Sequence, residues 1–231
     1  VIQGVFLDQE RLFIGGNNSL LGPLKADFGA MTAAGARIKG KLPRGLNYGH
    51  SLPKGTVDYD ARIFSVFSGI VNNQVNVLAE LTALANWYKQ VRMNFVAQDQ
   101  EQKFLYESGL RMVVLNYQER LHQLNRYVDS LENSVRLLES KHDSKKEISE
   151  QKELLSRWSK LGSEFKNLEK YEIQIPKYLQ EEFEKIKSQG ALDYTGIIQN
   201  LSKSGKKAGK KWLSEIALSV RNVYKAGMKK R

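Results

Sequence analysis

The middle of this chain lacks proline, and that constrains its fold more than any other feature. The four prolines are Pro23, Pro43, Pro53 and Pro176, so residues 54–175 contain none. Proline removes a backbone donor and breaks helices, so a stretch without it permits long, uninterrupted helices. Apolar residues recur through this stretch at alternating steps of three and four, which is typical of one helix face. The sequence therefore predicts an all-α fold with long helices.

Three runs of apolar residues, here called seams, follow a heptad spacing. The third runs from Leu154 to Leu168, and the first has Gln74 as its one polar position: Ile63, Phe67, Ile70, Gln74, Val77, Leu81, Leu84, Tyr88, Val91 and Phe95. The second has nine apolar positions in a row: Leu110, Val114, Tyr117, Leu121, Leu124, Val128, Leu131, Val135 and Leu138. Such seams predict an elongated bundle or coiled coil, and the second favours a homo-oligomer with these nine residues as interface anchors.

The first two seams are out of phase with each other. An interruption must therefore lie between Phe95 and Leu110, either as a turn or as a skip near Ser108 and Gly109 in a continuous helix. The sequence leaves open whether residues 63–138 form one helix or a hairpin.

Residues 1–56 differ in character from the rest of the chain. Residues 1–18 contain two short apolar runs and end in Gly-Gly-Asn-Asn, which favours a short β-hairpin or an extended arm. Residues 20–42 place apolar side chains on one helical stripe, although four glycines lower the helix propensity. We predict three regions: an N-terminal arm and amphipathic segment (1–56), a long-helix bundle or coiled coil (57–190), and a basic amphipathic C-terminal helix (191–231).

The last 30 residues hold most of the net charge. They contain one acid, Glu215, and ten basic residues, which gives +9 of the chain's +11: Lys203, Lys206, Lys207, Lys210, Lys211, Arg221, Lys225, Lys229, Lys230 and Arg231. We interpret 205–211 as a flexible basic linker and 212–228 as an amphipathic helix with Trp212 as an interface anchor. The ten basic residues are expected to bind an anionic membrane, a nucleic acid or an acidic protein, and the segment is expected to be separable from the bundle. The competing interpretation is a packed terminal helix with a solvated basic tail.

No pattern in the sequence indicates catalysis. The chain has no cysteine, and its three histidines lack metal-ligand spacing. The segment GKKAGKK departs from a phosphate-binding P-loop, because three residues separate its glycines and Lys211 stands where a hydroxyl is needed. We therefore expect no enzyme activity, cofactor, metal or small-molecule substrate. The longest apolar runs are far shorter than the roughly 20 residues that span a bilayer, which favours a soluble or peripheral protein, in the cytoplasm or in a virion.

These observations favour a non-enzymatic structural scaffold that assembles with itself and with other proteins of a large complex, such as a virus or phage particle. An alternative comes from the layout, in which an N-terminal amphipathic segment precedes three long helices. This layout is similar to that of BAR-type membrane-bending domains. The resemblance implies a peripheral protein that binds or shapes membranes.

Overall fold

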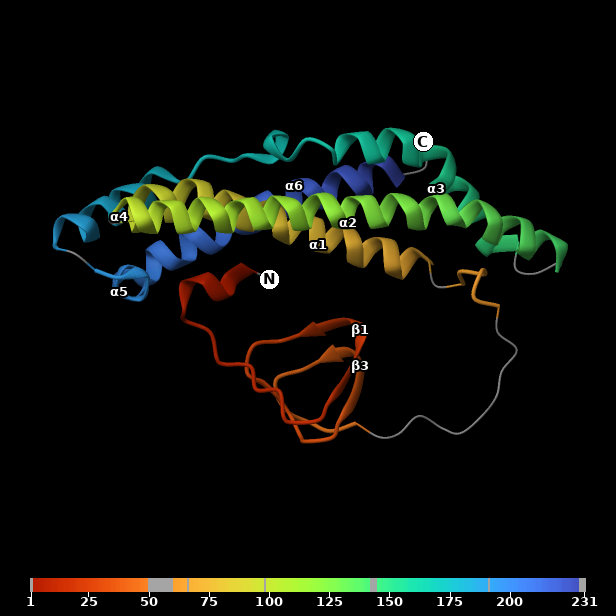
Figure 1. Cartoon of the computed structure of the whole chain (residues 1–231), viewed down its shortest axis with the longest axis horizontal. Coiled ribbons are helices and arrows are strands. Elements are labelled where there is room, and N and C mark those ends of the chain that lie inside the picture. Colours follow the sequence, from red (N-terminus) through yellow and green to blue (C-terminus); the bar gives the residue numbers. More distant parts are fainter. Residues whose placement is uncertain are drawn as a thin grey trace. The chain divides into compact units, whose positions relative to one another are not determined.

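The computed structural model describes residues 2–49, 60–65, 67–97, 99–141, 145–190 and 192–228. The prediction of a mostly helical protein is confirmed, and the N-terminal region contains short strands (Figure 1). Contacts divide the chain into two compact units. One comprises residues 6–59, and the other comprises residues 1–5 and 60–231.

The unit of residues 6–59 contains four strands: β1 (Ser19–Ala26), β2 (Ala30–Thr32), β3 (Arg37–Leu42) and β4 (Gly45–Asn47). β1 pairs in parallel with β3, and β2 pairs in parallel with β4. Phe13 adds an isolated parallel bridge to Met31. Because each strand pairs in parallel with the next but one, the chain follows a short helical path in which one turn stacks on the next. Its small core consists of Ala30, Ala36, Ile38 and Leu42, with Leu24 packed against it.

This unit corrects two predictions. The amphipathic helix predicted over 20–42 is wrong, because these residues form β1, β2 and β3. Of the two alternatives for residues 1–18, a hairpin or an extended arm, the hairpin is wrong, because residues 2–6 form a 3₁₀ turn and the described strand pairs are parallel. For residues 20–42 the physical reason is the backbone: Gly29, Gly35 and Gly40 have positive φ, a conformation that glycine adopts readily and that does not occur within an α-helix.

The helical unit contains six α-helices among the described residues. They are α1 (Phe67–Trp87), α2 (Gln100–Ser140), α3 (Lys145–Glu164), α4 (Lys177–Ser188), α5 (Tyr194–Asn200) and α6 (Lys203–Met228). A π-helical stretch, η2 (Tyr88–Val96), extends α1, and a 3₁₀ turn, η3 (Leu168–Tyr171), follows α3. α1 packs against both α2 and α6, and α3 packs against α2 (Figure 1).

Residues 63–138 form a hairpin rather than one continuous helix. η2 ends at Val96, and α2 begins after Asp99, whose carboxylate accepts a hydrogen bond from the backbone N–H of Gln102 at 2.8 Å. At the far end of the hairpin, the backbone N–H of Phe64 donates to Oγ of Ser134 at 3.0 Å. The interruption predicted between Phe95 and Leu110 is therefore a turn, and the alternative of a continuous helix with a skip near Ser108 and Gly109 is wrong.

The core of the helical unit is built from parts of the predicted seams. In the second seam, Tyr117 and the six positions that follow it are buried, while Leu110 and Val114 are half-buried. In α1 the buried face runs through Val71, Val75 and Leu78, whereas Val77 of the predicted seam is exposed. The structure thus shows a helical bundle within one chain, and most residues of the second seam are buried in the core of that bundle.

Candidate interaction surfaces

α6 begins earlier than the sequence suggested. Residues 205–211, interpreted as a flexible linker, are helical and belong to α6. Oγ of Ser202 accepts from the backbone N–H of Gly205 at 3.0 Å, and a carboxylate oxygen of Glu182 in α4 accepts from the N–H of Ser202. A Cβ atom at Gly205 would collide with this carboxylate, so a larger residue here would force the Glu182 side chain to shift. The linker prediction is wrong because these contacts fix the first turn of a helix.

The apolar arc of α6 is part of the bundle core. Trp212, Leu213, Ile216, Ala217 and Val220 are all buried. Nε1 of Trp212 donates to the carbonyl oxygen of Ile173 at 2.8 Å. The prediction that this end of the chain is separable from the bundle is therefore wrong, because its removal would expose the packed face of α1.

The basic side chains of α6 lie mainly on the opposite face. Lys203, Lys207, Lys211 and Lys225 are exposed, and Lys206, Lys210 and Arg221 are half-buried. Lys229, Lys230 and Arg231 lie outside the described residues. Arg221 is committed to the bundle, because its Nε donates to Oδ1 of Asn76 at 2.9 Å and it forms an ion pair with Glu80 of α1. Four exposed lysines thus form what we call the basic face of α6: Lys203, Lys207, Lys211 and Lys225.

A second exposed surface, which the sequence reasoning missed, lies on the first half of α2. Four large apolar side chains there have exposed fractions of 50% or more: Phe104 (69%), Leu105 (64%), Met112 (58%) and Leu115 (50%). Steps of eight and three residues separate Phe104, Met112 and Leu115, and Leu105 lies beside them, so the four share one side of the helix. We call this set the α2 stripe. The signal was present in the sequence as apolar residues that fall outside the second seam.

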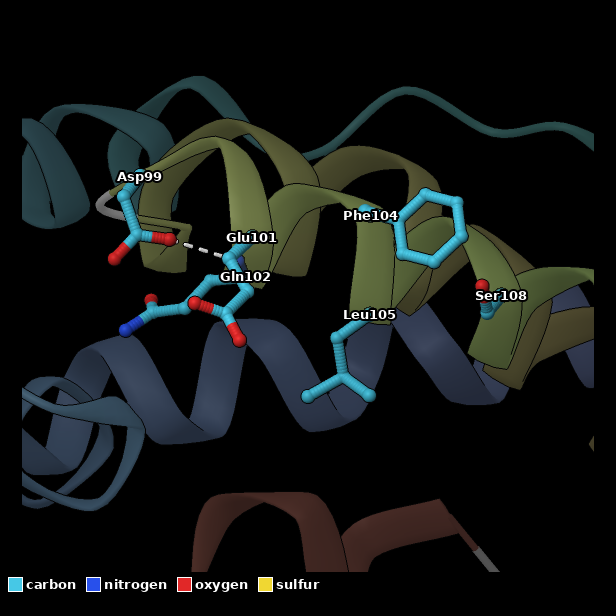
Figure 2. A pocket seen from close by; sticks show the side chains of 6 residues that line it. All are labelled: Asp99, Glu101, Gln102, Phe104, Leu105 and Ser108. Atoms are coloured by element: carbon cyan, nitrogen blue, oxygen red, sulfur yellow. Dashed lines mark hydrogen bonds between the residues drawn. The ribbon is translucent and has the colours of Figure 1, made fainter.

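Two shallow hollows lie beside the α2 stripe. One, of about 450 Å³, is lined by Phe104, Leu105, Ser108 and the polar residues Asp99, Glu101 and Gln102 (Figure 2). The other, of about 420 Å³, is lined by Leu105, Ser108 and Met112 of α2 and by Tyr88 and Arg92 of η2, together with Tyr106 and Gly109. Leu105 and Ser108 border both hollows, so the two hollows adjoin each other along the stripe.

Arg92, which lines the second hollow, lies against three tyrosine rings. Its guanidinium carbon lies 4.7 Å from the ring centre of Tyr88, 5.3 Å from that of Tyr106 and 4.3 Å from that of Tyr194. Such cation–π contacts are each worth about 0.5–2 kcal/mol. Burial also raises the pKa of Tyr106. Because the three rings come from η2, α2 and α5, Arg92 joins these elements at one end of the bundle.

Among the described residues, histidine, aspartate and glutamate form no cluster that could hold a metal ion. None of the described helices combines the length and the apolar character needed to cross a membrane. Comparison of the chain with protein-family models, curated proteins and solved structures gave no match.

Proposed function

We propose that the chain is a non-enzymatic helical scaffold that attaches to an anionic partner in a larger assembly through the basic face of α6. The observation that carries this proposal is the burial of one side of α6 together with the exposure of lysines on the other. Trp212 and Ile216 fix the helix to the bundle, so the lysines are presented from a rigid support.

The charge arrangement supports this role. Five lysines occur between residues 203 and 211, and that interval contains no acid. Positive side chains in a first helical turn oppose the helix dipole, and the carboxylate of Glu182 at the N-terminus of α6 offsets part of that cost. Within the basic face, Lys211 has an acidic neighbour, Glu215, at 3.8 Å. Closely spaced cations of this kind attract polyanions through a salt-dependent contact.

Attachment to an anionic membrane is the second candidate. A membrane-surface helix normally buries its apolar face in the lipid. In α6 that face packs against α1, so insertion would require the helix to leave the bundle. A membrane would therefore be held by the lysines alone. Adsorption of this kind is electrostatic and is weakened by salt.

The experiment compares two triple variants of the intact chain. The first replaces Lys203, Lys207 and Lys211 by Gln. The control replaces Lys103, Lys160 and Lys166 by Gln, three exposed lysines outside α6, and removes the same charge. Binding to duplex DNA, to phosphatidylserine vesicles and to neutral phosphatidylcholine vesicles is measured at low and moderate salt.

We expect the first variant to lose binding to anionic probes and the control to keep most of it. Binding by the parent chain should fall as salt rises, because neutralised phosphates release counterions. Equal losses in both variants would show that net charge, rather than the basic face, governs binding. A parent chain that binds neither anionic probe at low salt would contradict the proposal.

A further inference from the structure

The α2 stripe is nearly symmetric about its middle. Phe104 and Leu105 lie at one end, Met112 and Leu115 lie at the other, and the small residue Ser108 borders the hollows between them. A small side chain between larger apolar ones is the pattern that lets two helices approach and place the ridge of each in a groove of the other. We propose that the α2 stripe binds a second copy of this chain, with the two α2 helices antiparallel and crossing near Ser108 and Gly109.

The charges beside the stripe fit this arrangement. A two-fold axis that passes beside Gly109 places Glu107 opposite Arg111 of the second copy, and it places Phe104 within one residue of Leu115 of the second copy. Helix periodicity puts Glu107 and Arg111 on the same flank of the stripe. A two-fold axis perpendicular to the two helices brings this flank of one copy next to the same flank of the other copy. Both side chains are exposed, and in the described part of the chain neither has an ion-pair partner. The contact would thus gain two symmetry-related ion pairs.

The form of the surface argues for a protein surface over a small molecule. Sites for small molecules enclose most of the ligand, whereas both hollows are shallow and the side chains of Phe104 and Leu105 project from the helix (Figure 2). Projecting side chains beside hollows suit a partner with the same features. In the antiparallel arrangement, Met112 of one copy lies near the hollow beside Leu105 and Ser108 of the other.

The size of the stripe predicts a weak dimer. Residues 104–115 span about 16 Å of helix, and Glu101 and Glu119 lie beyond its two ends on the same side. Helices that cross at about 50° diverge quickly, so these like charges stay apart. The contact is then smaller than the roughly 800 Å² per partner of a standard interface, and association should depend strongly on concentration.

The first test measures mass by sedimentation of the intact chain from low to high micromolar concentration. We expect a reversible shift from monomer to dimer. Met112→Glu should abolish the shift, because it places a charge in the stripe. The matched control is Leu218→Glu, which changes an exposed apolar residue of α6 and should leave the shift intact. Circular dichroism verifies that both variants keep the parent's helical content.

The second test reverses the charges. Glu107→Arg alone and Arg111→Glu alone should each weaken association, because like charges then meet across the two-fold axis. An equal mixture of the two variants should associate again, since each mixed dimer contains two opposite-charge pairs. A chain that stays monomeric throughout, a dimer that survives Met112→Glu, or a mixture no stronger than its components would overturn the proposal.

Discussion

The side chain of Gln90 lies between η2 and the extended segment 172–176, and both ends of its amide are used. Nε2 donates to the carbonyl oxygen of Ile173 at 2.9 Å, and Oε1 accepts from the N–H of Ile175 at 2.7 Å. Nε2 also donates to Oδ1 of Asn86 at 3.1 Å. One buried amide thus fixes a strand-like segment that has no sheet to pair with.

Replacing Gln90 by Ala should destabilise the fold by about 1–3 kcal/mol, because the part-buried N–H of Ile175 would lose its partner. The measurement is urea unfolding followed by circular dichroism. Gln118→Ala, at an exposed position of α2, is the control and should change the unfolding free energy by less than about 0.5 kcal/mol. Equal effects of the two changes would show that the Gln90 contacts contribute nothing to stability.

Two helical glycines should respond in opposite directions to the same substitution. A Cβ atom at Gly109 would lie 2.6 Å from Cε1 of Tyr88, whereas a Cβ atom at Gly69 of α1 would meet nothing within 4 Å. Gly109→Ala should cost about 1–3 kcal/mol through overpacking, and Gly69→Ala should gain up to about 1 kcal/mol of helix propensity. Thermal unfolding of both variants measures the difference, and a stabilised Gly109→Ala would show that Tyr88 can move aside.

At the scale of elements, the packing of α6 against the other helices is needed for a stable bundle. Trp212 is buried and hydrogen-bonded to Ile173, so Trp212→Ala should cost about 3–5 kcal/mol. Deleting residues 202–231 should remove the helix that covers α1 and leave a chain with reduced helicity and no cooperative thermal transition. The control is Lys207→Ala, at an exposed position of the same helix, which should melt like the parent. A truncated chain with the parent's melting temperature would contradict the packing of α6.

How far the elements could be predicted depends on how local their signals are. In α2 the heptad pattern gave the buried face from Tyr117 to Leu138, because one side of that helix meets the bundle and the other meets water. In α1 apolar residues occupy several sides, so the seam chosen there included Val77, which is exposed. The segment 20–42 failed for another reason. Its apolar spacing is compatible with both a helix and short strands. Two of its glycines with positive φ lie in the turns between strands, and such turns cannot lie inside a helix.

The interaction surfaces were predicted in part for similar reasons. The lysines of α6 could be found from charge alone, and the structure places four of them on one exposed face. The sequence could not show whether the apolar arc of α6 packs on the bundle or on a partner. An amphipathic pattern predicts that one face is buried, but it does not identify what that face packs against. The α2 stripe was not predicted, because the uninterrupted second seam accounted for the helix pattern and the apolar residues outside that seam were left unassigned. Recognising Phe104 and Met112 as exposed requires knowledge of which side of α2 faces α1.

At the scale of the whole molecule, buried tyrosines link stability to alkaline pH. Burial raises the pKa of Tyr127 and that of Tyr171 to about 12, and burial also raises the pKa of Tyr117. The hydroxyl of Tyr117 donates to the carbonyl oxygen of Phe165 at 2.8 Å, and that of Tyr171 donates to the carbonyl oxygen of Glu164 at 3.1 Å. These phenols are therefore neutral in the folded chain at pH values where an unfolded chain would already release their protons.

The sign of the effect follows from proton counting. Between pH 10 and pH 12 the folded state holds more protons than the unfolded state, so stability is fully present below about pH 10 and falls as the pH rises through this range. We expect phenolate absorbance to rise in two stages, of which the second is the ionisation of these three tyrosines together with loss of helical circular dichroism. Tyr117→Phe should reduce the amplitude of the second stage. If all tyrosines ionised together near pH 10 while the helices stayed intact, these phenols would have to be accessible to water in the folded protein.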